Sequence, residues 1–565
     1  MTKIVELQIN NYRGINSFYQ RFDRDVICLV GRGDSGKTTI LEAIKSVLSP
    51  VWNLSFYDTD FYNLNADQPI EIIASLSHVP EKLLLEEKYG LWCRTLCRET
   101  GVVIDDISAG DISVLTIKLT VDKALEPKWT VLNGRREDEI RISAGDRSKL
   151  NCFMISDFID SHFSWNKGNP LNSLLKLHDV SADKEKIVLD AIREAKEKVD
   201  RADYAHFSGV TEAIKRQAAS LGLNLDGVQT TLDFKDISLK EGKVSLHRGD
   251  VPFRLMGKGS KRLASMAIQT AISRDGGIAL IDEIEQGLEP DRVKQVARTL
   301  KDENDGQVII TTHSREVAIE LEAQDLLVVN TNRATGEVNS NFLDLNDSQL
   351  QGAIRACPEA FFSKKVIICE GATEVGVCRA LDIYRLRVGK GPMCISDCSF
   401  VDGSGHSFTE RALNTASAGL IVSVLCDSDV DGELNPSKEH LRASGVQIFD
   451  SDDGNSFEDQ VFDDLPWAGI LDLLNYVTEV HQKTEDSLMN SVRAKYDGEF
   501  PENWKEMDTE KMREAIAKAS VVKKKEWFKS VGHGEQLGHI IFRYFEEIKT
   551  TSLYQTLSKL DNWID

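Results

Sequence analysis

The sequence predicts an α/β protein built from more than one structural unit, and three observations carry this prediction. The chain has 565 residues, which is more than one hydrophobic core usually supports. Short apolar runs of strand length, such as residues 26–30 and 278–281, alternate with helical patterns. Another such run starts near residue 366 and opens a second alternation of strand and helix. We therefore expect two α/β units in succession.

Changes in composition along the chain predict the boundaries of these units. A first α/β part covers residues 1–175 and resumes at residues 226–350, because the strand-rich pattern returns after a stretch rich in Ala, Glu, Lys and Arg. That stretch, residues 176–225, has helical periodicity and predicts an inserted helical element. Within the first part, residues 70–150 predict an antiparallel sheet. The second α/β unit covers residues 360–565 and ends in a charged helical tail.

Composition and charge exclude some classes of protein. Lys and Arg number 68 against 90 Asp and Glu, a net charge of −22, which argues against a chain that coats nucleic acid with its whole surface. A local basic groove stays compatible with this charge. No window approaches about 18 uninterrupted apolar residues, so we expect neither a membrane span nor a membrane partner.

The cysteine pattern indicates free thiols in a reducing compartment, which predicts a cytoplasmic protein. The ten cysteines are scattered, and several lie in apolar runs of strand type. Two C-x-x-x-C pairs occur, Cys93/Cys97 and Cys394/Cys398. Neither pair is followed by a second ligand pair at zinc-site spacing, so a zinc site is not expected.

A phosphate-binding loop is the strongest motif in the chain. Residues 31–38 read GRGDSGKT, which fits GxxxxGK[ST] directly after a strand and at the start of a helix. Backbone N–H groups of such a loop hold phosphates, Lys37 reaches the β and γ oxygens, and Thr38 coordinates Mg²⁺. We therefore expect ATP and Mg²⁺ to bind here, with the nucleotide-binding residues Gly31, Asp34, Gly36, Lys37, Thr38, Thr39 and Asp282.

Two later strands end in residues that suit ATP hydrolysis. The apolar run 278–281 is followed by Asp282 and Glu283. Asp282 would hold Mg²⁺ through water, and Glu283 would polarise the attacking water. The run 307–311 leads to His313, which we interpret as a sensor of the γ-phosphate at the same edge of the sheet, the alternative being an ordinary loop histidine.

These motifs resemble the ABC ATPase superfamily in its SMC/RecF/OLD branch. The opening residues 7–14 (LQINNYRG) resemble that branch's first strand, and residues 285–290 (EQGLEP) resemble its D-loop. Residues 255–262 (LMGKGSKR) occupy the signature position without the LSGGQ sequence, and a simple Gly-rich turn is the alternative. The resemblance implies that one protomer's signature segment completes its partner's ATP site. It therefore implies a homodimer or higher oligomer, with helices near residues 184–221 as the dimerisation element.

A second set of acidic residues follows two apolar runs in the C-terminal half. Glu370 follows the run 366–369 with Glu374 close behind, and Asp427 and Asp429 follow the run 421–426. Adjacent parallel strands would bring these carboxylates to one edge, where they repel unless a divalent cation neutralises them, so Mg²⁺ or Mn²⁺ is expected. The alternative is that the acids cap strands and helices.

The pair of motifs resembles the Toprim fold, whose marks are a strand-end Glu and a later DxD. Residues 401–405 (VDGSG) fit the turn between them, and Glu458 with Asp459 resembles a third acidic motif that helps to hold a second metal. The resemblance also implies a late lysine that stabilises charge on the phosphate. Lys529 is favoured over Lys525, because the segment after Lys529 resumes a helix, and a solvated helix face is the alternative for both.

The order of ATPase motifs and then Toprim motifs resembles the OLD (overcoming lysogenization defect) family, close to Gabija and retron-associated nucleases. The resemblance implies an ATP-binding and ATP-hydrolysing, metal-dependent DNA endonuclease of bacterial antiphage defence. Its partners would be DNA and, in some members, a UvrD-like helicase or a retron reverse transcriptase with its DNA, among which the sequence does not select. The implied catalytic residues are Glu283, His313, Glu370, Asp427, Asp429 and Lys529, and the implied metal ligands are Thr38, Glu370, Glu374, Asp427, Asp429, Glu458 and Asp459.

Two other functions stay open at this point. One is an ABC-type repair or chromosome-structure ATPase whose C-terminal domain binds nucleic acid without cleaving it. The clustered acids argue against it, since binding alone does not need them. The other is a nuclease whose ATPase half senses nucleotide without hydrolysing it, which the presence of Lys37, Asp282, Glu283 and His313 disfavours.

Overall fold

The computed structural model describes most of the chain. The described residues are 2–106, 111–136, 138–157, 159–165, 169–177, 190–191, 193–194, 197–198, 205–220, 245–274, 276–302, 306–343, 348–428, 434–452, 454–480, 485–523 and 525–565. Asp429 and most of the expected helical insert lie outside these residues. No helix in the described part of the chain is long and apolar enough to cross a bilayer.

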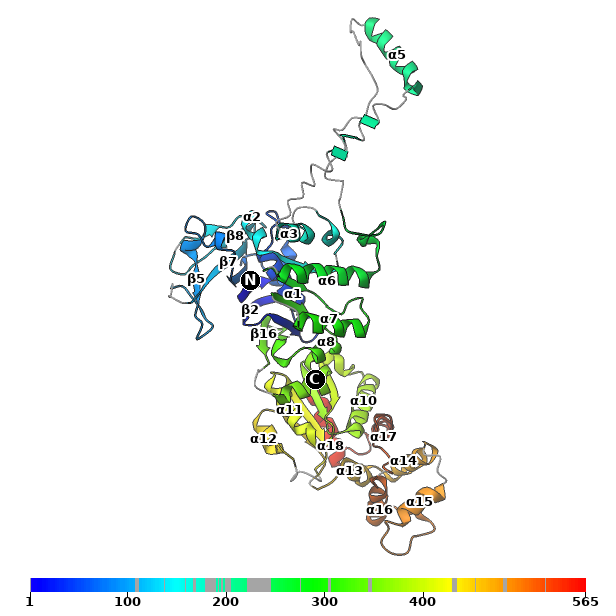
Figure 1. Ribbon diagram of the computed structural model, residues 1–565. Coiled ribbons are helices and arrows are strands. Elements are labelled where there is room, and N and C mark those ends of the chain that lie inside the picture. Colours follow the sequence, from blue (N-terminus) through cyan, green and yellow to red (C-terminus); the bar gives the residue numbers. More distant parts are fainter. Residues whose placement is uncertain are drawn as a thin grey trace.

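A 14-stranded mixed sheet forms the N-terminal body of the molecule (Figure 1), in the order β10-β13-β14-β3-β15-β16-β2-β1-β4-β7-β5-β6, with β8 and β9 attached to β7. From β10 to β15 the strands are parallel, and from β2 to β9 neighbouring strands are antiparallel. The strands are β1 Lys3–Tyr12, β2 Ile15–Arg21, β3 Val26–Val30, β4 Ile70–Ser77, β5 Arg94–Leu96, β6 Val103–Ile104, β7 Ile112–Val121, β8 Pro127–Val131, β9 Ile140–Arg141, β10 Cys152–Ile155, β13 Ile278–Ile281, β14 Gln307–Thr311, β15 Leu326–Thr331 and β16 Glu337–Phe342, besides the hairpin of β11 His247–Arg248 and β12 Val251–Pro252.

The sequence of the parallel strands explains their central place. Every residue of β3, β13 and β14 is buried, as expected for parallel strands that are covered on both faces. The strand predicted at 278–281 is found with these bounds, and the predicted antiparallel sheet at 70–150 is present. The helices of this body are α1 Lys37–Val47, α2 Ala144–Arg147, α3 Pro170–Leu177, α6 Lys258–Arg274, α7 Pro290–Asp302, α8 Arg315–Glu320 and α9 Ser348–Ala356.

Within the expected helical insert, the structure describes one longer helix, α5 Ala205–Ser220. Figure 1 shows α5 well away from the rest of the molecule. Val210 and Ile214 on this helix are 62% and 54% exposed. Two branched apolar side chains one helical turn apart therefore face solvent in the single chain.

A separate four-stranded sheet forms the C-terminal α/β unit, and all of its strands are parallel, in the order β18-β17-β19-β20. Its strands are β17 Lys365–Cys369, β18 Cys398–Asp402, β19 Ile421–Cys426 and β20 Gln447–Asp450. The helices of this unit are α10 Ala372–Arg387, α11 Phe408–Ser417, α12 Lys438–Ala443, α13 Phe457–Asp464, α14 Trp467–Val480, α15 Glu485–Arg493, α16 Glu510–Ser520, α17 Val531–Arg543 and α18 Ser552–Ile564. The expected α/β class is confirmed for the chain as a whole.

The two units share one hydrophobic core and several ion pairs. A single cluster of buried apolar residues continues from Cys28 in β3 through the fully buried Phe361 to Val424 in β19. At the surface of this contact, the Arg32 guanidinium of the phosphate loop lies 3.3 Å from the Asp397 carboxylate. Arg32 also donates a hydrogen bond of 2.6 Å to the carbonyl of Cys394. The phosphate loop is thus in direct contact with the second unit.

Glycines allow helix α17 to lie directly against α10, which carries Glu374. A Cβ placed on Gly534 of α17 would lie 2.5 Å from the carbonyl oxygen of Thr373, and one on Gly376 of α10 would lie 2.4 Å from the backbone nitrogen of Glu535. Real side chains do not tolerate such distances to backbone atoms. The close packing therefore fixes the start of α17, and with it Lys529, next to the start of α10.

We expect Gly534→Ala to destabilise the fold by about 1–3 kcal/mol, because the added methyl group overpacks a backbone contact. Chemical denaturation followed by circular dichroism measures this change. Gly532→Ala in the same helix is the matched control, since a Cβ there meets no atom within 4 Å and alanine favours helix. Equal stability of the two variants would contradict the packing described here.

Candidate functional sites: a nucleotide loop and an acidic cluster

The phosphate loop connects β3 to α1 in a shape that glycine makes possible. Gly31 and Gly36 have φ values of 142° and 88°, which residues other than glycine rarely adopt. A Cβ on Gly31 would also lie 2.4 Å from the carbonyl oxygen of Val329. Asp34 is exposed with a φ of 61°, and Thr39 lies half-buried in the first turn of α1.

Lys37 folds its ammonium group back into this loop. Its Nζ donates to the carbonyls of Gly31 and Arg32 at 2.9 and 2.7 Å, and to the Ser35 hydroxyl at 3.2 Å. Burial lowers the pKa of Lys37 to about 8, although nearby carboxylates, Asp282 first, oppose the shift. The arrangement holds a cation at the centre of a ring of loop atoms, where a phosphate group would meet it.

Asp282 lies across from Thr38 at the carboxyl edge of the parallel strands. The Asp282 Oδ1 atom accepts hydrogen bonds from the hydroxyls of Thr38, at 2.9 Å, and Thr311, at 2.7 Å. β13 and β3 flank β14 in parallel register, which explains why their ends meet. The Thr38 hydroxyl and the Asp282 carboxylate are oxygen donors of the kind that Mg²⁺ prefers, so these residues fit the expected ion.

Glu283 follows Asp282 in a left-handed conformation with a φ of 46°. Such backbone strain in a residue other than glycine is common at functional sites. Its backbone N–H donates to the Thr311 hydroxyl at 2.8 Å. Burial, together with the charges of Asp282 and Glu285, raises the pKa of the Glu283 carboxyl. A carboxylate of raised pKa is a stronger base toward water.

His313 follows β14 in a segment that Glu285 holds. The two Glu285 carboxylate oxygens accept from the His313 backbone N–H at 2.6 Å and from the Thr312 hydroxyl at 2.7 Å. Burial lowers the pKa of His313, and the nearby Lys37 charge acts in the same direction. His313 is therefore neutral near pH 7 and able to hydrogen-bond rather than to pair as a cation.

Arg262, the last residue of the expected signature segment, has a structural role in this site that the sequence did not predict. It lies in α6 and donates to the carbonyls of Asp282 and, at 2.6 Å, Glu283, and to the Gln286 side chain at 2.8 Å. The segment after β13 is thereby fixed by a buried guanidinium. Next to it, a Cβ on Gly259 would lie 2.7 Å from the Gly287 carbonyl oxygen, so the expected signature segment packs against the D-loop-like segment of its own chain.

In the C-terminal sheet, backbone hydrogen bonds link the two strand-end acids. Glu370 follows β17, and its Oε2 accepts from the backbone N–H of Asp427 at 2.9 Å. Asp427 follows β19, and its Oδ1 accepts from the backbone N–H of Phe457 at 2.7 Å. The parallel pairing of β17 with β19 brings the two residues to the same edge.

Two further acids lie at helix starts beside this edge. The Glu374 Oε2 in α10 accepts from the backbone N–H of Gly371 at 2.8 Å. The Glu458 Oε1 in α13 accepts from the Thr373 hydroxyl at 3.4 Å. Both side chains are almost fully buried, with residue exposures of 2% and 3%. We call Glu370, Glu374, Asp427 and Glu458 the acidic cluster.

Burial raises the pKa values of three members of the acidic cluster, and neighbouring carboxylates of the cluster raise two of these pKa values further. Burial raises the pKa of Asp427, and the charges of Glu374, Glu370 and Glu458 raise it further. The pKa of Glu374 is raised by burial and then by Glu458, and the pKa of Glu458 is raised by burial. A nearby positive charge stabilises the ionised form of buried carboxylates whose pKa values are raised.

Lys529 supplies such a charge. Burial lowers the pKa of Lys529, but the four carboxylates of the acidic cluster outweigh it and raise the pKa. The Thr373 hydroxyl donates to the carbonyl of Phe528 at 3.2 Å, which ties the segment before Lys529 to α10. The side chain of Lys529 keeps contact with solvent and can meet a bound anion.

The acidic cluster does not have the compact arrangement of a formed metal site. Among the described residues, no three His, Cys, Asp or Glu side chains stand close enough together to hold a metal ion. Asp429, expected as a further ligand, lies outside the described residues. The chemistry of the donors still fits a hard cation, since all are carboxylates.

Asp459, expected from the sequence as a metal ligand, caps a helix in this structure. Its carboxylate accepts from the backbone N–H of Ser456 at 3.1 Å and from the Ser456 hydroxyl at 2.8 Å. These contacts form the capping box of α13. The cap orients the helix that carries Glu458, and the role of Asp459 as a metal ligand stays a prediction.

Two family models match the parts of the chain that carry the first of these two sites. Residues 2–86 match the model described as "AAA ATPase domain", and residues 155–320 match the model described as "AAA domain, putative AbiEii toxin, Type IV TA system". The first match contains the phosphate loop, and the second contains Asp282, Glu283 and His313. The chain contains an ATPase domain of the AAA type. No curated protein matches the chain.

Among solved structures, heads of SMC proteins show a distant likeness. The Smc head domain with an extended coiled coil bound to the C-terminal domain of ScpA from Pyrococcus furiosus is 17% identical, covers 61% of this chain and 97% of its own, and has a TM-score of 0.35. The SMC head domain from Thermotoga maritima is 14% identical, covers 61% of this chain and 100% of its own, and has a TM-score of 0.29. A likeness this distant supports no conclusion about function.

Substitution of Lys37 and of Glu283 should separate ATP binding from ATP hydrolysis. Lys37→Ala removes the cation of the phosphate loop, so we expect loss of binding and turnover. Glu283→Gln keeps the phosphate contacts but cannot polarise water as a carboxylate does, so we expect bound ATP and turnover reduced at least 100-fold, about 2.7 kcal/mol of barrier. Titration calorimetry and a phosphate-release assay measure the two properties.

Lys45→Ala is the matched control on the same helix, since this exposed lysine pairs only with Glu42 among its described contacts. It should bind and hydrolyse ATP as the unmodified protein does. Loss of ATP binding in Glu283→Gln would contradict the division of roles between the two residues.

Proposed function

We propose that this protein is an ATP-controlled, divalent-cation-dependent DNA endonuclease that combines the ATPase domain with a Toprim-like nuclease domain, as in the OLD family. The observation that carries the proposal is the acidic cluster with Lys529 beside it, at the carboxyl edge of a parallel sheet separate from the ATPase sheet. The order of the motifs along the chain supports it as well.

The charges of the cluster support cleavage rather than simple binding. DNA is a polyanion, and four buried or half-buried carboxylates would repel it. A bound Mg²⁺ or Mn²⁺ would reverse the sign of the local field and supply Lewis-acid stabilisation of phosphate oxygens. Glu370 and Asp427 are the proposed primary ligands, with Asp429, Glu374 and Glu458 completing the set. Lys529 would neutralise charge on the phosphate.

By the same resemblance, we propose that the protein acts on DNA in bacterial antiphage defence, as a homo-oligomer. The resemblance extends to members that work beside a UvrD-like helicase or a retron reverse transcriptase. A repair or chromosome-structure ATPase with a non-cleaving C-terminal domain is the competing function, and the first experiment below distinguishes the two.

We expect Glu370→Ala and Asp427→Ala to abolish DNA cleavage and to leave ATP turnover near that of the unmodified protein. The reason is that both residues lie in a sheet separate from the one that carries the ATP site. Plasmid nicking and linearisation with Mg²⁺ or Mn²⁺, measured beside phosphate release, test this expectation.

Glu439→Ala is the control for this experiment, because Glu439 is an exposed acid on α12 of the same unit. Excess EDTA should stop cleavage by the unmodified protein. Cleavage that survives Glu370→Ala or EDTA would refute the nuclease assignment, and ATP turnover without any cleavage would favour the non-cleaving ATPase.

Lys529→Ala should slow cleavage about 100-fold while DNA binding changes little, because a group that stabilises developing charge is worth about 3 kcal/mol in the transition state. Lys525→Ala serves as the comparison, since this exposed lysine is four residues earlier on the same segment. Single-turnover cleavage rates at saturating protein measure the effect. A larger effect at Lys525 than at Lys529 would reverse the assignment.

Helix α5 is the proposed dimerisation element, because Val210 and Ile214 expose apolar surface that a partner copy would cover. We expect Val210→Asp combined with Ile214→Asp to shift the protein toward monomer and to lower ATP turnover per chain. Light scattering at micromolar concentration measures the mass. A monomeric unmodified protein with ATP bound would contradict the proposal.

A further inference from the structure

A cavity of about 800 Å³ lies beside the C-terminal end of α1, apart from both sites described above. One wall is the segment 52–57, which lies between α1 and the antiparallel sheet, and the other is formed by β8 and α2. Since α1 has 11 residues, the cavity is about 16 Å from the phosphate loop along the helix. Its volume suits a ligand the size of a nucleotide.

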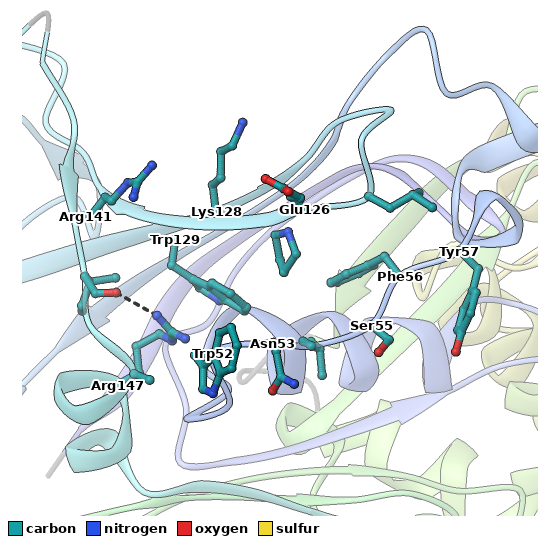
Figure 2. Close-up of a pocket in the computed structure, with 15 residues that line it drawn as sticks. Trp52, Asn53, Ser55, Phe56, Tyr57, Glu126, Lys128, Trp129, Arg141 and Arg147 are labelled. Atoms are coloured by element: carbon teal, nitrogen blue, oxygen red, sulfur yellow. Dashed lines mark hydrogen bonds between the residues drawn. The ribbon is translucent and has the colours of Figure 1, made fainter.

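Aromatic rings dominate the interior of this cavity. Figure 2 shows the rings of Trp52 and Trp129 next to one another, with Phe56 and Tyr57 farther along the wall that carries Trp52. Trp52 is 77% exposed and Tyr57 is 64% exposed, which is unusual for side chains of this size. Rings that stay open to solvent beside a cavity are suited to stacking on a planar ligand.

Arg147 holds the cavity in shape. Its guanidinium donates to the carbonyls of Ser49 at 2.6 Å, Val51 at 3.1 Å and Ile142 at 2.8 Å. It also lies 3.9 Å from the centre of the Trp129 ring. The Trp129 indole N–H in turn donates to the carbonyl of Ser46 at 3.2 Å. The segment after α1 and the wall that carries Trp129 are therefore fixed relative to each other.

Positive charge is in excess around the cavity. Arg147 is 2% exposed, and no carboxylate of the described residues lies within 4 Å of it. Burial lowers the pKa of Arg147 to about 10, so it remains a cation near neutral pH. Lys128 and Arg141 lie at the edge, where Figure 2 shows them pointing away from the rings, and Lys128 also pairs with Asp122 at 3.0 Å. Glu126 is the single acid among the lining residues.

We propose that this cavity binds a nucleotide, whose base stacks on Trp52 within the aromatic wall and whose phosphate is attracted by the surrounding cations. A base offers a planar face, and its phosphate offers the negative charge that Arg147, Lys128 and Arg141 favour. Two sources share this chemistry: a free nucleotide and an unpaired base of a nucleic-acid strand. In a strand, the flanking phosphates would pass the edge formed by Lys128 and Arg141.

Binding of fluorescein-labelled dT15 to the full-length protein, in EDTA and without ATP, tests the proposal by fluorescence anisotropy. Trp52→Ala should weaken binding at least 10-fold, and Arg141→Glu should weaken it at least threefold. The matched controls are Tyr19→Ala, a 54% exposed aromatic residue elsewhere on the same sheet, and Lys82→Glu, an exposed lysine outside the cavity. Both controls should bind as the unmodified protein does.

Tryptophan emission gives a second readout, which would not change on ligand addition if Trp52 had only a structural role. Binding should quench the emission of the unmodified protein, and Trp52→Phe should remove most of this quenching while it keeps an aromatic ring and most of the affinity. Competition with dTMP distinguishes the sources: a strand is indicated if dT15 binds at least 10-fold more tightly, and a free nucleotide if the two bind alike. The proposal is overturned if neither probe binds, or if Trp52→Ala binds as tightly as the unmodified protein.

Discussion

The common carboxyl edge of parallel strands is the constraint on which both proposed sites depend. In the large sheet, β3, β14 and β13 end side by side, which brings the phosphate loop, His313 and Asp282 to the same edge of the sheet. In the small sheet, β17 and β19 do the same for Glu370 and Asp427. The strands are buried on both faces and cannot shift without exposing their apolar residues. The functional groups therefore sit on rigid supports, while the loops that carry them stay at the surface.

The two edges bury charges of opposite sign. Lys37 is a cation surrounded by loop carbonyls, and its pKa is lowered by burial. In the acidic cluster, burial raises the pKa values of Glu374, Asp427 and Glu458, and the charge of Lys529 offsets part of this effect. Each edge therefore favours a ligand of the opposite charge: the first a phosphate group, the second a cation. In both cases the bound ligand would reduce the free-energy cost of burying unpaired charge in the folded chain.

The sequence predicts these edges well because each motif is local. A buried strand, a turn and the polar residues that follow span about ten residues, so Lys37, Asp282, Glu370 and Asp427 could be recognised from residue order alone. The contacts that orient them are not local. Arg262 reaches carbonyls 20 residues away across a helix and a strand, and Gly534 meets Thr373 across the domain. Such contacts depend on how elements pack, which residue spacing does not encode. The capping contact of Asp459 with Ser456 is likewise a detail that residue order alone did not predict.

The Arg32–Asp397 ion pair has a thermodynamic consequence for the chain. Arg32 is the second residue of the phosphate loop, and Asp397 belongs to the turn before β18 in the other unit. A ligand of one unit that changes the energy of this contact must also change the energy of the other unit. If nucleotide alters the affinity of the C-terminal unit for its substrate by some factor, the substrate must alter the affinity for nucleotide by the same factor. The coupling between the two units is thus a single free energy that belongs to neither unit alone. It can be measured by titrating either ligand in the presence and absence of the other.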